Sequence, residues 1–150
     1  MAGSPRISAS IASKPASVAS AFLDTNVLLY LLSSDSAKDD RVHALLLEGG
    51  GVISVQVLNE FSSVCRRKLR MSRSETLEVL EPIRSVCRVV PLTLETFDSG
   101  MLVSDEYGYS IYDSMIVAAA LLAECPVLYG EDLQHGQVVN KRLTIKNPFK

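Results

Sequence analysis

Four acidic side chains of this sequence are spaced so that an α/β fold would bring them to one place. They are Asp24, Glu60, Asp113 and Asp132. Asp24 directly follows the short apolar run Ala21–Leu23. Asp132 lies just beyond a second such run, Val127–Tyr129. Ligands of open parallel sheets bind outside the carboxyl ends of the strands, so we expect these two acids at the same sheet edge.

The other two acids lie in segments with helical periodicity. Glu60 is about two turns into a helix expected to begin after Ser54, and it lies beside the apolar stripe of that helix. Asp113 lies in the first turn of a helix expected after Ser110, and it is the only ionised residue among residues 109–123. A carboxylate in so apolar a segment is costly unless it is paired or bound to a metal ion.

A metal site is therefore the chemistry that these residues favour together. Carboxylate oxygens suit Mg²⁺ or Mn²⁺ better than zinc, and we expect one or two ions. Taken singly, each acid has a plainer interpretation. These interpretations are a helix N-cap for Asp24, a solvated helix face for Glu60, a partner of the helix dipole for Asp113 and a turn residue for Asp132.

The elements that must position these acids follow a β-α rhythm from Ala21 onward. Short apolar runs alternate with helical segments, which predicts the α/β class with a central, mostly parallel sheet of four to five short strands. The expected strands are Ala21–Leu23, Val52–Ile53, Cys87–Leu92, Val127–Tyr129 and Leu143–Ile145. The expected helix N-caps are Ser54, Ser72, Thr93 and Ser110. Pro82 is expected to end or kink the helix that begins after Ser72.

Length and composition predict one globular domain over residues 21–150, since 47% of the chain is hydrophobic and 21% is charged. Residues 1–20 are rich in Ser and Ala, and we interpret them as a flexible extension in preference to a targeting peptide. The three cysteines show no pairing motif, which is typical of a reducing compartment, so we expect a cytoplasmic protein. The longest apolar run, Met115–Ala123, is too short for a bilayer, which takes roughly 20 residues.

The net charge of −2 does not by itself favour a nucleic-acid partner, because such binding draws on Lys and Arg. Bound divalent cations would offset part of that acidity.

Four short motifs resemble the PIN domain and, within that family, the VapC-type toxins of bacterial toxin-antitoxin pairs. They are Asp-Thr-Asn at 24–26, Asn-Glu at 59–60, Asp-Ser-Met-Ile-Val-Ala-Ala-Ala at 113–120 and Glu-Asp-Leu-Gln-His-Gly at 131–136. The resemblance covers roughly residues 21–150 in the family's order and spacing. Gly130 differs from the family, which usually has Ser or Thr two residues before the last acid.

The resemblance implies a three-layer α/β/α sandwich that cuts single-stranded or loop RNA with Mg²⁺ or Mn²⁺. It further implies a homodimer and an antitoxin protein as partner. By position, the catalytic and metal-holding residues would be Asp24, Glu60, Asp113 and Asp132. A stand-alone RNA-processing nuclease and a catalytically silent binding module stay open as alternatives. A phosphatase that forms an aspartyl-phosphate is disfavoured, because it needs a second acid where Asn26 stands.

Several neighbours of the acids have two interpretations each. Thr25 and Asn26 are expected to orient the Asp24 carboxylate, although simple helix capping explains them equally well. Glu131 is either a spare ligand or, as we favour, ordinary loop polarity. A basic run after Glu60 is either an RNA phosphate contact or, more commonly for such runs, a solvated helix face. It consists of Arg66, Arg67, Lys68, Arg70 and Arg73.

Overall fold

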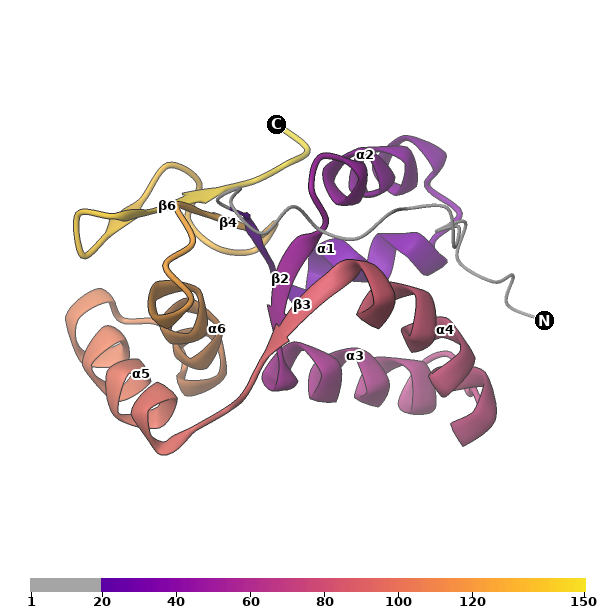
Figure 1. Ribbon diagram of the computed structural model, residues 1–150, viewed down its shortest axis with the longest axis horizontal. Coiled ribbons are helices and arrows are strands. Elements are labelled where there is room, and N and C mark those ends of the chain that lie inside the picture. Colours follow the sequence, from indigo (N-terminus) through magenta and orange to yellow (C-terminus); the bar gives the residue numbers. More distant parts are fainter. Residues whose placement is uncertain (1–19) are drawn as a thin grey trace.

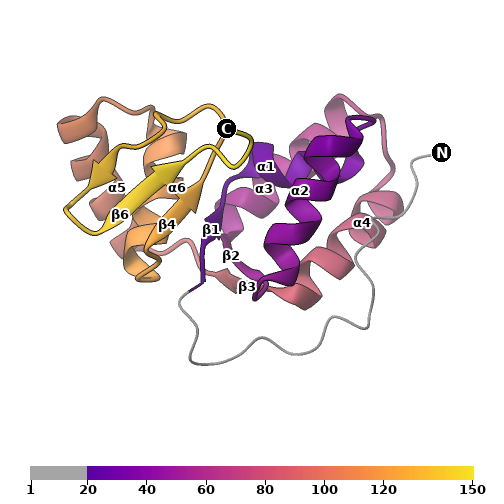
Figure 2. The same cartoon turned by 90° about the horizontal axis from the view of Figure 1, so that it is seen from above.

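The computed structural model describes residues 20–150, and the extension expected at 1–20 lies outside this range except for Ser20. A single six-stranded sheet forms the centre, in the order β3-β2-β1-β4-β6-β5. The strands are β1 (Phe22–Leu23), β2 (Gly51–Ser54), β3 (Cys87–Val90), β4 (Val127–Tyr129), β5 (Val138–Val139) and β6 (Leu143–Lys146). All neighbouring pairs are parallel except β5 with β6. Figure 2 shows β6, β4, β1, β2 and β3 in that order across the molecule.

Helices cover both faces of this sheet, as the α/β prediction requires. They are α1 (Thr25–Leu29), which continues into a 3-10 turn at Tyr30–Leu32, α2 (Ser36–Leu47), α3 (Val55–Arg67), α4 (Arg73–Val86), α5 (Leu94–Tyr107) and α6 (Ile111–Leu122). In Figure 1, α3, α5 and α6 lie below the sheet and α2 lies above it. The predicted fold class is therefore confirmed. Within residues 20–150, no helix has the length and apolar character needed to cross a membrane.

The core lies between the central strands and the inner helices. Both residues of β1 and all four of β2 are buried, as expected for parallel strands covered on both faces. α6 contributes its whole segment Ser114–Leu121 to the interior. Cys65, Cys87 and Cys125 are buried, so they act as small core residues. This packing holds β1 and β4 rigidly side by side, and the site is built on their ends.

The local signals for helix ends are confirmed. Ser54 Oγ accepts a hydrogen bond from Val57 N at 3.3 Å, and Ser110 Oγ accepts one from Asp113 N at 3.1 Å. Ser72 and Thr93 both form capping boxes. Gly108 ends α5 in the left-handed region, with φ of 75°, where glycine carries no Cβ strain.

Three expectations about the elements need correction. Of the two outcomes expected at Pro82, an end of the helix is wrong: α4 runs on to Val86, because the following Ile83 and Val86 are buried and their burial offsets the missing hydrogen bond. The strand β5 was not expected, since a segment of two residues is too short to show a hydrophobic period. It forms because it pairs with the edge of β6 that β4 leaves unpaired. The expected strand Cys87–Leu92 ends earlier, at Val90, where pairing with β2 stops at Ser54.

Candidate active site

Asp24 and Asp132 lie at the carboxyl ends of two paired strands. β1 and β4 are parallel and in register, with Leu23 opposite Tyr129. The backbone N–H of Asp24 donates to the carbonyl oxygen of Tyr129 at 3.0 Å, which extends this pairing by one residue. Asp132 follows three residues after Tyr129. The structure therefore places both acids at the sheet edge where the sequence predicts them.

Asp24 is the buried centre of the acidic group. Its exposed fraction is 5%, and Oδ1 accepts a hydrogen bond from Thr25 N at 2.7 Å, so Asp24 is also the N-cap of α1. Burial raises the pKa of Asp24 to about 7, and the negative charges of Glu60, Asp113 and Asp132 add to this increase, while the Thr25 hydrogen bond opposes it. All three other acids are thus within electrostatic reach of Asp24.

Glu60 approaches Asp24 from α3. Its Oε1 accepts a hydrogen bond from Gln56 Nε2 at 3.1 Å, one helical turn earlier. Burial, and next the negative charge of Asp113, raises the pKa of Glu60, while Gln56 and Thr25 lower it. The hydroxyl of Thr25 is buried and makes no hydrogen bond of normal geometry among residues 20–150. It nevertheless lies close enough to Glu60 to favour the ionised carboxylate.

Asp113 completes the group from the first turn of α6. Its negative charge raises the pKa values of Asp24 and Glu60, as well as that of Tyr109. Of the neighbours that orient the acids, Gln56 was missed by sequence reasoning. Its spacing of four residues from Glu60 on one helix was the signal that could have identified it.

Asp132 is exposed and is held by Asn26. The side-chain amide of Asn26 donates to Asp132 Oδ2. Asn26 was expected to orient Asp24, but in the structure its side-chain amide binds the carboxylate of Asp132 instead. Thr25, in contrast, does bind Asp24, through its backbone N–H.

Gly130 explains the close approach between the β4 end and Asp24. A Cβ atom at this position would lie 3.4 Å from Asp24 Oδ2 and 3.1 Å from Leu133 Cδ1. The second distance is tighter than side chains normally tolerate, so Leu133 would have to move. The glycine is therefore matched to the present packing of Leu133 beneath the loop.

The chemistry of the donors fits a hard divalent cation, because all four are carboxylates and one of them is buried among like charges. A bound cation would offset this repulsion. The four carboxylates are, however, not gathered tightly around one point. Within the described part of the chain, no three Asp, Glu, His or Cys side chains are gathered closely enough to form a finished metal site. Asp24, Glu60 and Asp132 instead turn toward Thr25, Gln56 and Asn26.

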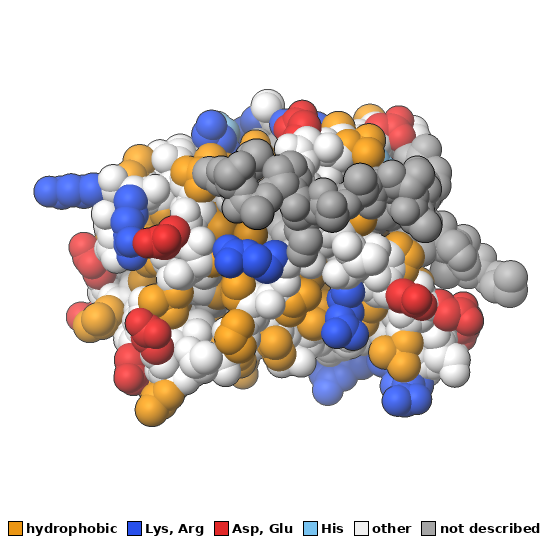
Figure 3. Space-filling model, in the orientation of Figure 1, with side chains coloured by type: hydrophobic (Ala, Val, Ile, Leu, Met, Phe, Trp, Pro, Cys, Tyr) orange, Lys and Arg blue, Asp and Glu red, His pale blue; other side chains and the backbone are white. Residues whose placement is uncertain are grey.

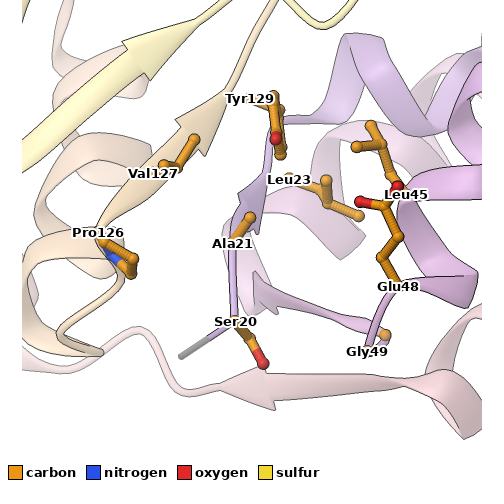
Figure 4. A pocket seen from close by; sticks show the side chains of 10 residues that line it. Ser20, Ala21, Leu23, Leu45, Glu48, Gly49, Pro126, Val127 and Tyr129 are labelled. Carbon is orange, nitrogen blue, oxygen red and sulfur yellow. The ribbon is translucent and has the colours of Figure 1, made fainter. Parts of the chain in front are cut away.

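Two of the hollows among residues 20–150 differ in their relation to the acids. One of about 210 Å³ lies between β1, β4 and the end of α2; Leu23, Pro126, Tyr129 and Glu48 are among its lining residues (Figure 4). None of the four acids lines it, so we do not assign it a role in catalysis. Another, of about 300 Å³, is lined by Asn26, Leu29, Tyr30, Ser33, Glu131 and Asp132, and it borders the acidic group directly.

The basic run is exposed throughout. Arg67 follows Glu60 by seven residues, which is close to two helical turns, so it lies on the same flank of α3, roughly 10 Å along the axis. Arg66 lies on another flank, because six residues correspond to about 240° of rotation. Lys68, Arg70 and Arg73 lie beyond the end of α3. Only Arg67 of this run therefore shares the Glu60 side of the helix.

The chain belongs to the PIN domain family, whose sequence pattern matches residues 21–139. Its fold is similar to that of VapC20 from Mycobacterium tuberculosis, a sarcin-ricin loop cleaving toxin. The TM-score is 0.62 at 19% identity, and the match covers 75% of this chain and 90% of that chain. No curated protein matches it in sequence.

Two further solved structures share the fold. A toxin-antitoxin complex from Klebsiella pneumoniae matches with a TM-score of 0.64 at 18% identity, covering 86% of this chain and 98% of that chain. VapBC2 from Rickettsia felis, solved with a DNA fragment from the promoter, matches with a TM-score of 0.61 at 15% identity and covers 85% and 98%. The resemblance to VapC-type toxins seen in the sequence is therefore confirmed at the level of fold.

Proposed function

We propose that this PIN domain is a metal-dependent endoribonuclease that hydrolyses RNA phosphodiester bonds, and that it is the toxin of a type II toxin-antitoxin pair. One observation carries the proposal. Asp24 is buried at a strand end with the charges of Glu60, Asp113 and Asp132 acting on it, which is the environment of a cation-binding catalytic site. The similarity in fold to proteins described as toxins and toxin-antitoxin complexes supports the choice of substrate and partner.

The four acids would hold one or two Mg²⁺ or Mn²⁺ ions. When bound, such an ion lowers the pKa of a water molecule and polarises the phosphate. The chain's own residues prepare the site for it. Asp24 must give up its proton, Gln56 directs Glu60, and Asn26 directs Asp132. Thr25 N–H fixes the orientation of the Asp24 carboxylate through its hydrogen bond to Oδ1.

An RNA cleavage assay with purified protein and Mn²⁺ tests this proposal. Cleavage should stop with EDTA, return with added Mn²⁺, and be lost in Asp24→Asn. Binding of Mn²⁺ without any cleavage of RNA would favour the silent binding module. Cleavage by a protein with no cognate antitoxin encoded beside it would favour the stand-alone processing nuclease. A toxin of this kind would act in the cytoplasm, where its RNA targets are.

Arg67 is proposed to contact an RNA phosphate, since it shares the flank of Glu60. The charge reversal Arg67→Glu should raise the KM for RNA by roughly fivefold, the equivalent of about 1 kcal/mol, and should reduce the log–log salt slope of KM by about one. Arg66→Glu is the matched control, because it changes the same charge on another flank of α3. Equal effects of the two variants would show that the run acts only through its total charge.

A second copy of the chain is proposed to cover the apolar stripe of α5. This stripe is formed by Leu94, Phe97, Met101 and Leu102, which are 75%, 48%, 43% and 72% exposed. Their spacing places them on one side of the helix. Exposed apolar patches of this kind mark association surfaces in soluble proteins. α5 also carries Glu95, Asp98, Asp105 and Glu106 and no basic residue. Figure 3 shows acidic and hydrophobic side chains intermingled over this end of the molecule, at lower left.

The double variant Phe97→Glu/Leu102→Glu should elute as a monomer in size-exclusion chromatography with light scattering, where the wild-type chain elutes as a dimer. Because the stripe is flanked by acids, dimerisation should strengthen as the ionic strength rises and like charges are screened. Leu47→Glu, at an equally exposed leucine of α2, is the control and should leave the dimer intact. A wild-type monomer at every ionic strength would refute the assignment.

A further inference from the structure

We propose that Lys38 and Tyr30 act through Glu131 as positioning residues, which hold the loop after β4 so that Asp132 is presented to the cation site. The inference rests on the proposed function, since it concerns the same acidic group. It replaces both interpretations of Glu131, because it makes this residue neither a spare ligand nor ordinary loop polarity.

The carboxylate of Glu131 is engaged at both oxygens. Lys38 Nζ donates to Glu131 Oε1 at 2.5 Å, and Tyr30 Oη donates to Glu131 Oε2 at 2.5 Å. Lys38 Nζ also donates to Tyr30 Oη at 3.0 Å, which closes a triangle of three side chains. These contacts fix the orientation of the Glu131 carboxylate toward Lys38 and Tyr30.

Two aromatic rings reinforce this triangle. Lys38 Nζ lies 4.6 Å from the ring centroid of Tyr30 and 5.0 Å from that of Phe149. The two rings pack edge to face at 4.9 Å. An exposed ion pair alone contributes little to stability. Here the ammonium group also lies over two aromatic rings and donates to a phenol, and the Lys38 side chain is only 30% exposed. The cluster thus links the end of α1, the first turn of α2 and the C-terminal segment to one loop residue.

The loop itself depends on such anchors. Residues 130–137 have no regular secondary structure. Backbone hydrogen bonds to β6 hold the two ends of the loop, from Gly130 N to Lys146 O at 3.0 Å and from Gly136 N to Ile145 O at 2.7 Å. Next to Asp132, the buried Leu133 is the side-chain anchor on one side and Glu131 is a side-chain anchor on the other. Asp132 itself is exposed, and its carboxylate accepts a hydrogen bond from the side-chain amide of Asn26. Loss of the Glu131 anchor should therefore free Asp132 to move, without removing any of the four acids.

The direction in which Mn²⁺ affinity changes distinguishes a positioning role from a purely electrostatic one. Lys38→Glu adds negative charge near the site, which by charge alone would tighten binding of Mn²⁺, whereas Glu131→Lys would weaken it. Positioning predicts that both substitutions weaken binding, because both break the anchor. The double swap Lys38→Glu/Glu131→Lys re-forms an ion pair of opposite polarity and should restore binding.

The experiment measures Mn²⁺ binding by calorimetry, and amide hydrogen exchange of residues 130–137 in the metal-free protein. Each single swap should weaken Mn²⁺ binding roughly tenfold, the usual loss for a group that orients a ligand, and should speed exchange in the loop. The double swap should bring both readouts within about threefold of wild type. Tyr30→Phe removes one hydrogen bond only and should produce a smaller loss of the same sign. Glu95→Lys on α5 is the charge-matched control and should change neither readout.

Tighter Mn²⁺ binding in Lys38→Glu, or exchange rates in the loop that no variant changes, would overturn the proposal. Failure of the double swap, combined with a Glu131→Gln loss as large as that of Asp132→Asn, would instead make Glu131 a ligand. Hydrogen exchange needs neither metal nor RNA, so the anchor is tested even if the wild-type chain cuts no RNA. A wild type that binds Mn²⁺ but cuts no RNA would contradict the proposed function alone.

Discussion

Asp24→Asn should lower the rate of RNA cleavage by roughly 10²- to 10³-fold at saturating Mn²⁺, because the lost ligand removes several kcal/mol of transition-state stabilisation. The fold should survive. Asn is a good N-cap residue, and its Oδ1 can accept the hydrogen bond that Thr25 N now donates to Asp24 at 2.7 Å. The measurement is the single-turnover cleavage rate of purified protein, with circular dichroism to verify that the variant is folded.

Asp35→Asn is the matched control for this variant. Asp35 is also an aspartate N-cap, that of α2, and its Oδ1 accepts from Lys38 N at 3.2 Å. It is exposed and is not one of the four acids. Its substitution should leave cleavage within about twofold of wild type, since only a capping contact is altered. If Asp24→Asn retains the wild-type rate, the acidic group is not the catalytic site.

The same substitution should stabilise the metal-free protein at pH 8 but not at pH 4. Burial, with the three neighbouring acids, raises the pKa of Asp24 from 3.8 to about 7, so folding favours its neutral form. This preference adds to the free energy of unfolding below pH 3.8, the ordinary pKa of an aspartate. The added stability is lost as the pH rises from there to about 7. Three pKa units correspond to about 4 kcal/mol. Asn carries no charge at any pH, so the variant escapes this loss.

Thermal unfolding in EDTA between pH 4 and pH 9 measures this effect. The melting temperature of the wild-type chain should fall, relative to that of Asp24→Asn, as the pH rises from about 4 to about 7, and the difference should then level off. Added Mn²⁺ should recover the wild-type stability at pH 8, because the ion binds the folded, ionised site. Parallel melting curves of the two proteins across the whole range would show that Asp24 has an ordinary pKa.

Local features of the fold could be predicted because they depend on residues within a few positions of one another. Four helices are capped by hydrogen bonds to residues three positions later, from the caps Ser54, Ser72, Thr93 and Ser110. Gly108 ends α5 because a residue without a Cβ adopts the left-handed conformation readily. The strands β1 and β4 could likewise be predicted from their short apolar runs. Since strand ends of a parallel sheet share an edge, the position of Asp24 beside the loop of Asp132 followed from the same information.

Other features appear only when distant segments meet. Pro82 continues α4 because the core takes up Ile83 and Val86, and β5 exists because β6 has a free edge. Asn26 binds Asp132 across 106 residues of sequence, in place of the nearby Asp24. No local pattern encodes which of two carboxylates an amide will reach, since that depends on the relative placement of two chain segments.

The amino-acid sequence by itself determined the fold class, the helix N-caps and the placement of Asp24 and Asp132 at the edge of the sheet, because hydrophobic period and capping are short-range properties. Only the tertiary structure decided how those acids are held. Burial at the end of β1 raises the pKa of Asp24, and the anchor of Glu131 comes from Lys38, 93 residues away. The physical reason is that desolvation and side-chain pairing depend on distance in space, which packing of the whole chain establishes.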